Sequence, residues 1–337
     1  MRTTIKAVSV IIGTIIGAGF ASGKEIYIFF NVYGVKGLLG ITISTILTGI
    51  IIYKVLISAR DKRIKNYNTY LERLGLNKKV KQILNIIVNI FLLITFYIMI
   101  AGFTAYFKQE FNIMPLFISI IVSFLCYITL INNIEGITKV NMFLCPILIL
   151  IIVFIGIKIG DYSYYSITDK AREISSNIKT TSNWLIASLE YASYNNIMLI
   201  PMLITLKKYT YKKEKKIAIL SSVIFLMLAI ILYVILLNGG ASLNNVELPS
   251  VWIMGKTGTI FKYICGLVVV LAIYTSAIAA GHSFIENQKD AKRLLTIILC
   301  ISAIFVYKIG FSNLVKVLYP VFGLIGLVQL VAILIKK

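Results

Sequence analysis

The chain contains 337 residues, of which 59% are apolar and only 14% are charged. A water-soluble domain rarely exceeds about half apolar residues, because its surface needs charge, so much of this chain must face lipid. The formal net charge of +21 does not indicate nucleic-acid binding. Lys and Arg lie in short clusters between apolar runs, as the positive-inside rule describes for membrane proteins. We therefore expect a lipid bilayer, and no nucleic acid, as a partner.

Long apolar runs recur along the whole chain. Crossing the hydrocarbon core takes about 20 apolar residues per helix, and the sequence supplies about ten such runs. The predicted spans are residues 5–30, 36–59, 81–107, 113–132, 139–159, 183–205, 216–238, 259–286, 293–308 and 314–335. The expected fold class is an all-α integral membrane protein of about ten transmembrane helices.

The basic residues indicate how these spans are oriented. In a ten-span arrangement, all segments rich in lysine and arginine fall on one side; they are 54–81, 207–216, 289–293 and 336–337. The loops on the other side carry fewer basic residues; they are 107–113, 160–182, 239–258 and 309–313. Because positively charged loops remain in the cytoplasm, we expect both termini to be cytoplasmic.

The spans divide into two halves of similar length. The first half covers about 5–159, the second covers about 183–335, and residues 160–182 form a polar connector within a single transmembrane domain. Because five is odd, the second half enters the membrane from the opposite side. This outline predicts a 5+5 inverted repeat, a common plan among transporters.

The first span is rich in glycine. Gly13, Gly17, Gly19 and Gly23 fall within eleven residues, and each costs a helix roughly 1 kcal/mol relative to alanine. Backbone groups released from a helix cannot be satisfied by lipid, so an unwound stretch must line a cavity or bind something. The alternative is close helix packing, since the glycines also form small-xxx-small pairs.

The sixth span, which opens the second half, has polar residues at its centre. Glu190 lies about seven residues inside the span, and Pro201 lies near its end. An ionised carboxylate at the bilayer centre costs about 2.5–3.5 kcal/mol on insertion scales, so Glu190 is expected to face a cavity or a partner. Three roles are open for Glu190: it contacts a substrate ammonium group, it carries a proton, or it forms a structural hydrogen bond to another span. We predict that spans one and six are both broken, which indicates a binding site between them.

The eighth span carries two adjacent hydroxyl groups, on Thr275 and Ser276. Such hydroxyls often bond back to the carbonyl four residues earlier. A small hard cation, however, prefers several oxygen ligands. An unwound Gly13–Gly17 stretch offers carbonyl oxygens that would complement these two hydroxyls.

These motifs resemble a known family. The segment Gly13–Gly19, GTIIGAG, resembles the broken first helix of the LeuT-fold, amino acid–polyamine–organocation (APC) superfamily of transporters. The segment Ala272–Ser276 resembles the sodium motif in the eighth helix of that fold. The longer string from Gly13 to Glu25 more narrowly resembles the YkvI-like bacterial membrane proteins. The resemblance implies a multi-pass protein of the bacterial plasma membrane, and an external lid formed by residues 239–258.

The resemblance also implies functional residues. A sodium site would use carbonyl and hydroxyl oxygens of Gly13, Ile16, Ala272, Thr275 and Ser276. The implied substrate-binding residues are Ala18, Gly19, Phe20, Tyr97, Ser188, Glu190 and Tyr191, and the implied gating residues are Lys24 and Glu25. In this arrangement, N–H groups near Ala18–Phe20 would bind a carboxylate, and Glu190 with Ser188 would face an amine.

The predicted function is therefore secondary active transport of a small organic solute, an amino acid or related amine, by alternating access with sodium as coupling ion. A proton-coupled carrier that uses Glu190 is the alternative. A transporter-like solute sensor is the alternative from another class. No enzyme motif is recognisable, so we expect no catalytic residue and no organic cofactor. The four cysteines, Cys126, Cys145, Cys265 and Cys300, are interpreted as small core residues.

Overall fold

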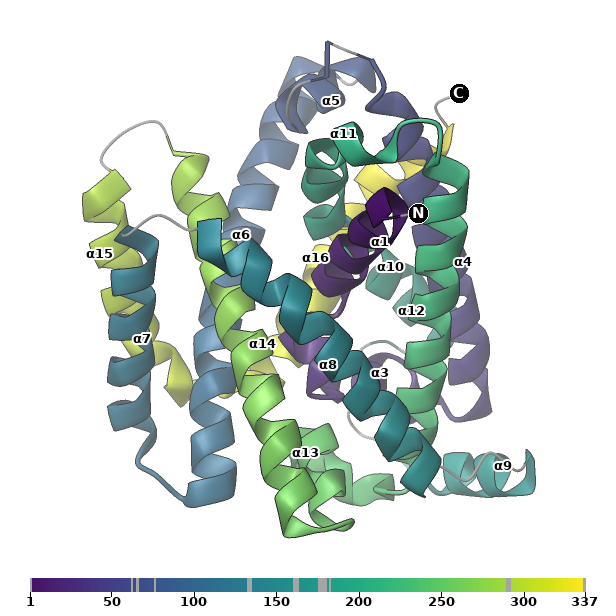
Figure 1. Ribbon diagram of the computed structural model, residues 1–337, viewed down its shortest axis with the longest axis vertical. Coiled ribbons are helices and arrows are strands. Elements are labelled where there is room, and N and C mark those ends of the chain that lie inside the picture. Colours follow the sequence, from purple (N-terminus) through teal and green to yellow (C-terminus); the bar gives the residue numbers. More distant parts are fainter. Residues whose placement is uncertain are drawn as a thin grey trace.

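In the computed structural model, all regular secondary structure of the described residues is helical (Figure 1). The structure describes residues 2–61, 63–64, 67–75, 77–131, 135–159, 164–174, 181, 183–288 and 292–335. Each of the ten predicted spans corresponds to helical structure at nearly the predicted boundaries. Several residues used to predict orientation lie outside this part of the chain; they are Lys62, Lys65, Lys289, Lys336 and Lys337.

Spans one to five correspond to α1 (Arg2–Ile15) with α2 (Ala18–Ala21) and α3 (Lys24–Phe29), then α4 (Val35–Ser58), α6 (Lys78–Phe111), α7 (Pro115–Ile131) and α8 (Glu135–Ile159). Spans six to ten correspond to α10 (Trp184–Thr205), α12 (Glu214–Leu237), α14 (Thr259–Glu286), α15 (Lys292–Ala303) with the 3-10 helix η3 (Ile304–Lys308), and α16 (Phe311–Ile335). The connections hold η1 (Asn31–Tyr33), α5 (Tyr67–Arg73), α9 (Tyr164–Glu173), α11 (Lys207–Thr210), η2 (Gly240–Asn245) and α13 (Pro249–Gly255).

Among the described residues, five helices are long and apolar enough to cross a membrane by length and composition; they are α4, α6, α12, α14 and α16. The remaining spans include the broken first span and the shorter helix α7. Large apolar side chains remain exposed on the outer surfaces of the long helices, such as Ile260 with 74% of its surface exposed. Water would not favour such surfaces, whereas lipid does.

The first span is broken as predicted, but only at the end of the expected Gly13–Gly17 stretch, because residues 13–15 remain in α1 (Arg2–Ile15). Helix α1 ends at Ile15 and α2 begins at Ala18, and the Gly17 N–H donates to the Ile15 carbonyl at 2.9 Å in place of a regular helical bond. A second interruption separates α2 from α3 at Gly23, whose φ of 78° favours glycine. The glycines therefore allow the chain to leave the helical path twice inside one span.

The predicted break in the sixth span is wrong. Helix α10 runs without interruption from Trp184 to Thr205, with Pro201 inside it. The amide of Asn195 donates to the Tyr191 carbonyl at 2.9 Å, and the amide of Asn196 donates to the Ala192 carbonyl at 2.7 Å. The polar side chains bond to carbonyl groups of their own helix, so they do not require it to unwind.

The helix contacts show a paired pattern between the two halves. Helix α4 packs on α10 and α1 packs on α12, so the second span of each half packs on the first span of the other half. Helix α6 packs on α16 and α14 packs on α8, so the third span of each half packs on the fifth span of the other half. The first and fifth spans also meet within each half, as α1 with α8 and α10 with α16. This exchange pattern is that of a 5+5 repeat.

The ends of the molecule are consistent with an even number of spans. Figure 1 shows both chain termini in the upper half of the view, together with α5 and α11, whereas α9 and α13 lie at the lower end. The segments between α4 and α6 and between α10 and α12, which are rich in basic residues, thus lie towards the same end as the termini.

Candidate functional site

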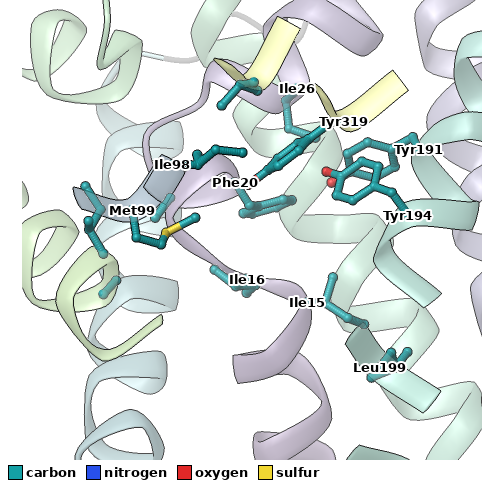
Figure 2. Packing of buried hydrophobic residues seen from close by; sticks show 14 of the residues in the cluster. Ile15, Ile16, Phe20, Ile26, Ile98, Met99, Tyr191, Tyr194, Leu199 and Tyr319 are labelled. Atoms are coloured by element: carbon teal, nitrogen blue, oxygen red, sulfur yellow. The ribbon is translucent and has the colours of Figure 1, made fainter. Parts of the chain in front are cut away.

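Aromatic side chains gather beside the break in the first span. Figure 2 shows Phe20 from α2 and Tyr319 from α16 close to Tyr191 and Tyr194 from α10. The rings of Tyr194 and Tyr319 stack with centroids 4.6 Å apart, and Tyr191 meets Tyr194 edge-on at 5.4 Å. Residues far apart in sequence thus form one aromatic cluster around the discontinuous first span.

Glu25 is part of this cluster. The hydroxyl of Tyr194 donates to Glu25 Oε2 at 2.5 Å, and both side chains are buried. The carboxylate folds back over Gly19, where a Cβ atom would overlap it. Glu25, predicted as a gating residue, therefore occupies the space above one of the backbone positions predicted to bind a substrate carboxylate.

Lys24 points to a different part of the molecule. Its ammonium group donates to the carbonyl of Val246 at 2.7 Å and to those of Leu243 and Asn244 at 3.4 Å. These acceptors belong to residues 239–258, which hold η2 and α13 and which we call the lid. Although Lys24 and Glu25 are neighbours in sequence, they bind separate elements, and their role as a gate remains a prediction.

Two further residues tie the lid to the broken span. The hydroxyl of Tyr27 on α3 donates to Asn244 Oδ1 at 2.7 Å and to the Gly240 carbonyl at 3.0 Å. Ser250 at the start of α13 donates its hydroxyl to the Ala21 carbonyl at 2.8 Å and its N–H to the Ser22 carbonyl at 2.9 Å. The lid thus satisfies carbonyl groups that the turn between α2 and α3 leaves free.

Glu190 is the most unusual residue of α10. Its side chain is 1% exposed, and neither carboxylate oxygen has a hydrogen-bond partner among the described residues. Ser193 Oγ and Asn196 Oδ1, at three-residue intervals along the same helix, are likewise buried without a partner. Burying a carboxylate costs free energy unless the group is paired or protonated. This stripe of α10 therefore has polar atoms that a ligand or a proton could still satisfy.

The close approach of α16 shapes this part of α10. A Cβ at Gly323 would lie 2.7 Å from the Glu190 carbonyl oxygen, and one at Gly326 would lie 3.1 Å from that of Ser193. The two glycines therefore let α16 approach the α10 backbone at the level of the partnerless carboxylate. Small residues at such contacts are typical of helix packing in membranes.

Ser188 does not share this face. Its hydroxyl donates to the Trp184 carbonyl at 2.7 Å, and its carbonyl accepts a 2.7 Å bond from Ser44 on α4. A Cβ at Gly40 would overlap the Ser188 hydroxyl. Ser188 thus packs α10 against α4, whereas Glu190 lies by α16, and the structure does not bring the two together as an amine site.

Tyr97 also lies away from the aromatic cluster. Its hydroxyl is 2.7 Å from Ser302 Oγ, a contact that joins α6 to α15. For Ala18, the structure describes the backbone but not the side chain. Sequence reasoning missed Tyr194 and Tyr319. For Tyr194 there is a signal, because it follows Tyr191 by three residues and Glu190 by four, which places it next to both on the helix surface.

Of the residues predicted to bind sodium, Gly13 lies in the last turn of α1 and Ile16 lies at the break, whereas Ala272, Thr275 and Ser276 lie on α14. Ile16, Ala272 and Thr275 are buried, and Gly13 and Ser276 are half-buried. Helix α2 packs against α14, so the chain just after the break lies against the helix that carries the two hydroxyls. Thr275 donates to the carbonyls of Leu271 at 3.0 Å and Ala272 at 3.1 Å. The sodium site remains a prediction.

The cysteines agree with their interpretation as core residues where they are described. Cys126, Cys265 and Cys300 are buried and carry free thiols, and the side chain of Cys145 lies outside the described residues. In the part of the chain that the structure describes, no three His, Cys, Asp or Glu side chains gather in a group that could hold a metal ion.

No protein-family model matches the chain. Two Bacillus subtilis proteins are similar over nearly their whole length. The uncharacterised protein YyaD is 25% identical, with 99% of this chain and 97% of that protein covered. The uncharacterised membrane protein YkvI is 27% identical, with 97% and 94% covered.

Solved structures share the fold. A mutant manganese transporter of Eremococcus coleocola matches with a TM-score of 0.61 at 14% identity, covering 98% of this chain and 78% of that one. MhsT in complex with L-phenylalanine matches with a TM-score of 0.59 at 19% identity, covering 93% and 80%. A Na⁺-coupled sialic acid symporter matches with a TM-score of 0.57 at 15% identity, covering 93% and 72%.

These likenesses confirm the predicted resemblance to YkvI-like membrane proteins and the LeuT-like fold. The chain is thus a multi-pass, all-α membrane protein. The similar structures are membrane transporters and not enzymes, in agreement with the absence of an enzyme motif from the sequence.

Proposed function

We propose that this protein is a secondary active transporter that carries a small organic solute, an amino acid or related amine, by alternating access. The observation that carries this proposal is the buried carboxylate of Glu190, which has no hydrogen-bond partner among the described residues, inside a fold shared with known transporters. An intramembrane acid normally faces a cation, a partner or a cavity. A solute ammonium group would supply the missing partner.

Within this class, the arrangement favours an amine over a zwitterionic amino acid. Two buried carboxylates, Glu25 and Glu190, lie on elements that pack together, and the rings of Tyr191 and Tyr194 are beside them. Carboxylates and aromatic faces both attract organic cations. The N–H groups near Ala18–Phe20, proposed for a substrate carboxylate, would be opposed by the charge of Glu25 above Gly19.

We propose sodium as the coupling ion, bound by carbonyl oxygens of Gly13, Ile16 and Ala272 and the hydroxyls of Thr275 and Ser276. The contact of α2 with α14 supports this site, because it holds the chain after the break against the helix that carries the second set of ligands. The similar sialic acid symporter is Na⁺-coupled. A cation between the two elements would hold them together and so favour one conformation of the transporter.

Proton coupling is the second candidate, favoured by the Tyr194–Glu25 hydrogen bond. A carboxylate that is buried with a phenol as its hydrogen-bond donor has no counter-charge in that contact. Taking up a proton removes the cost of burying its charge. Glu25 and Glu190 would then exchange protons with the two sides of the membrane as the protein changes conformation.

We further propose that the transporter comprises two inverted repeats, about 5–159 and 183–335, in a bacterial plasma membrane with both termini in the cytoplasm. The crosswise helix pairs support the repeats, and the common end shared by the termini supports the orientation. The lid would then face outwards, and Lys24 would hold it closed over the broken span.

The test is counterflow in proteoliposomes that contain purified protein. Vesicles loaded with unlabelled solute are diluted into trace amounts of labelled aliphatic amines, zwitterionic amino acids or carboxylates. A carrier accumulates the labelled solute, whereas a sensor binds it without exchange. We expect exchange of amines, lost in Glu190→Gln, which removes the charge and keeps the shape.

The control is Glu72→Gln on α5, an exposed acid remote from the site. Saturable binding of a solute with no counterflow would overturn transport in favour of a sensor. Amine exchange that survives Glu190→Gln would exclude Glu190 as the ammonium contact. Imposing a sodium gradient and a pH gradient in separate runs distinguishes the two coupling ions.

A further inference from the structure

A cavity of about 710 Å³ lies where the end of α4 meets the beginning of α12. It is lined by Tyr53, Ile57, Arg60, Lys212, Lys213, Glu214, Lys215, Lys216, Ile219, Leu220 and Val223. We call it the α4–α12 groove. None of its lining residues belongs to the proposed solute or sodium site, so its chemistry needs a separate explanation.

One end of the groove is strongly basic. Five of its lining side chains are cationic and one, Glu214, is acidic. Arg60 neutralises that acid through two hydrogen bonds, of 2.7 Å from Nε and 2.5 Å from a terminal nitrogen. Four lysines therefore remain without a carboxylate among the groove residues, and Lys215 and Lys216 are exposed. The N-terminus of α12 adds the positive end of a helix dipole.

The remainder of the groove is apolar and faces outwards. Its lining side chains on α12 are 54% exposed at Ile219, 37% at Leu220 and 46% at Val223. On α4, Tyr53 is 38% and Ile57 is 36% exposed. The four-residue intervals from Tyr53 to Ile57 and from Ile219 to Val223 place these side chains on one face of each helix. Both faces continue from the basic end along helices long enough to span the bilayer.

We propose that the α4–α12 groove binds an anionic phospholipid, with its phosphate among the lysines and one acyl chain along the apolar wall. A free anion would use only the basic end, and a neutral hydrocarbon would use only the wall. An anionic lipid is complementary to both, and basic pockets between transmembrane helices are a recognised type of headgroup site. By contacting α4 and α12 together, the lipid would stabilise the pairing of these helices.

The test measures lipid binding to the detergent-purified full chain by native mass spectrometry and by the shift in melting temperature. The probes are dioleoylphosphatidylglycerol, which is anionic, and dioleoylphosphatidylcholine, which is zwitterionic. We expect binding and stabilisation with the anionic lipid. The charge-reversal variant Lys215→Glu/Lys216→Glu should bind it at least roughly 30-fold more weakly, since each basic residue near an anionic lipid contributes about 1 kcal/mol.

The matched control is Lys78→Glu/Lys79→Glu, which makes the same charge change at exposed lysines at the start of α6, outside the groove. It should retain the wild-type affinity. Equal weakening in both double variants would show a general charge effect and overturn the site. Inorganic phosphate, added at the same concentration, should not stabilise the protein; stabilisation equal to that by the lipid would show an anion site without an acyl component.

A second variant tests the apolar wall and does not depend on the lysine variant folding. Val223→Trp places a large side chain in the groove, and Ile301→Trp on α15, 55% exposed at a site outside the groove, is its control. We expect Val223→Trp to lower the number of bound anionic lipids while Ile301→Trp does not. Unchanged lipid binding in Val223→Trp would overturn the proposed position of the acyl chain.

Discussion

The hydroxyl of Tyr194 donates a 2.5 Å hydrogen bond to Glu25, although the two residues are 169 positions apart. This bond joins α10 to the third helical piece of the first span. Glu25 in turn covers Gly19, so the phenol, the carboxylate and the glycine backbone form one buried unit. The unit lies where the two halves of the chain meet.

Removing the phenol hydroxyl should destabilise this unit. Tyr194→Phe keeps the ring stacked on Tyr319 but leaves Glu25 Oε2 without its donor. Losing a partner of a buried charged group costs about 1–3 kcal/mol or more. We expect a lower melting temperature at alkaline pH and a smaller loss at acidic pH, where a protonated Glu25 no longer needs a donor. Differential scanning calorimetry over a pH series checks this.

The control for the phenol is Tyr319→Phe, which keeps the other ring of the stacked pair. We expect it to lower the melting temperature less than Tyr194→Phe does. An identical, pH-independent loss in both variants would mean that losing any buried hydroxyl, and not the hydrogen bond to Glu25, explains the effect.

The glycines of the first span should differ sharply in their tolerance of alanine. A Cβ at Gly19 would overlap the Glu25 carboxylate, whereas a Cβ at Gly17 meets no atom within 4 Å. Overpacking of this kind typically costs about 1–3 kcal/mol. We therefore expect Gly19→Ala to lower the melting temperature and solute exchange, and Gly17→Ala to retain both.

A double-mutant cycle tests whether the clash with Glu25 is the cause. In a Glu25→Ala background, Gly19→Ala should cost much less stability than it does in the parent protein, because interacting sites are not additive. Equal costs in the two backgrounds would assign the effect to the α2 backbone instead.

Replacing Lys24 should free the lid. Lys24→Met keeps the apolar stem but removes the ammonium group that donates to the carbonyls of Leu243, Asn244 and Val246. We expect faster labelling of a cysteine introduced at Ala241, measured by maleimide modification, together with reduced solute exchange.

Lys36→Met is the control for Lys24, because Lys36 is exposed at the start of α4. It should leave the labelling rate unchanged. If Lys24→Met also leaves it unchanged, Tyr27 and Ser250 are sufficient to hold the lid, and Lys24 has no role as a gate.

Sodium should stabilise the folded protein if the proposed ion site exists. A ligand that binds only the folded state adds about 2.7 kcal/mol at a concentration 100-fold above its Kd. We expect a higher melting temperature in sodium chloride than in potassium chloride at equal ionic strength, and loss of this difference in Thr275→Ala/Ser276→Ala. The same melting temperature in both salts would reject the sodium site and favour proton coupling.

Helix positions were predictable because lipid imposes a simple requirement. A segment that crosses the bilayer must be apolar for about 20 residues and must satisfy its own backbone hydrogen bonds. Boundaries such as Val35–Ser58 and Thr259–Glu286 therefore lie close to the predicted ones. The glycines likewise indicated an unwound Gly13–Gly17 stretch, because their effect on the backbone is local, and the structure has the break at its end, at Ile16 and Gly17.

The continuous α10 shows where local signals fail. The polar centre of the sixth span predicted a broken helix, but the side chains of Asn195 and Asn196 there each donate to a carbonyl of their own helix. Whether a polar side chain breaks a helix or bonds back to it depends on which partners the neighbouring helices offer. The sequence alone does not show which partners those helices offer.

The sequence by itself determined that the chain lies in a membrane, approximately where its spans lie, and that the first span is interrupted. Only the tertiary structure decided that Glu25 meets Tyr194, that Lys24 meets the lid, and that Ser188 and Glu190 face different helices. The physical reason is the distance along the chain over which each effect acts. Burial and helix formation follow from nearby residues, whereas the partner of a buried polar group depends on how distant segments pack.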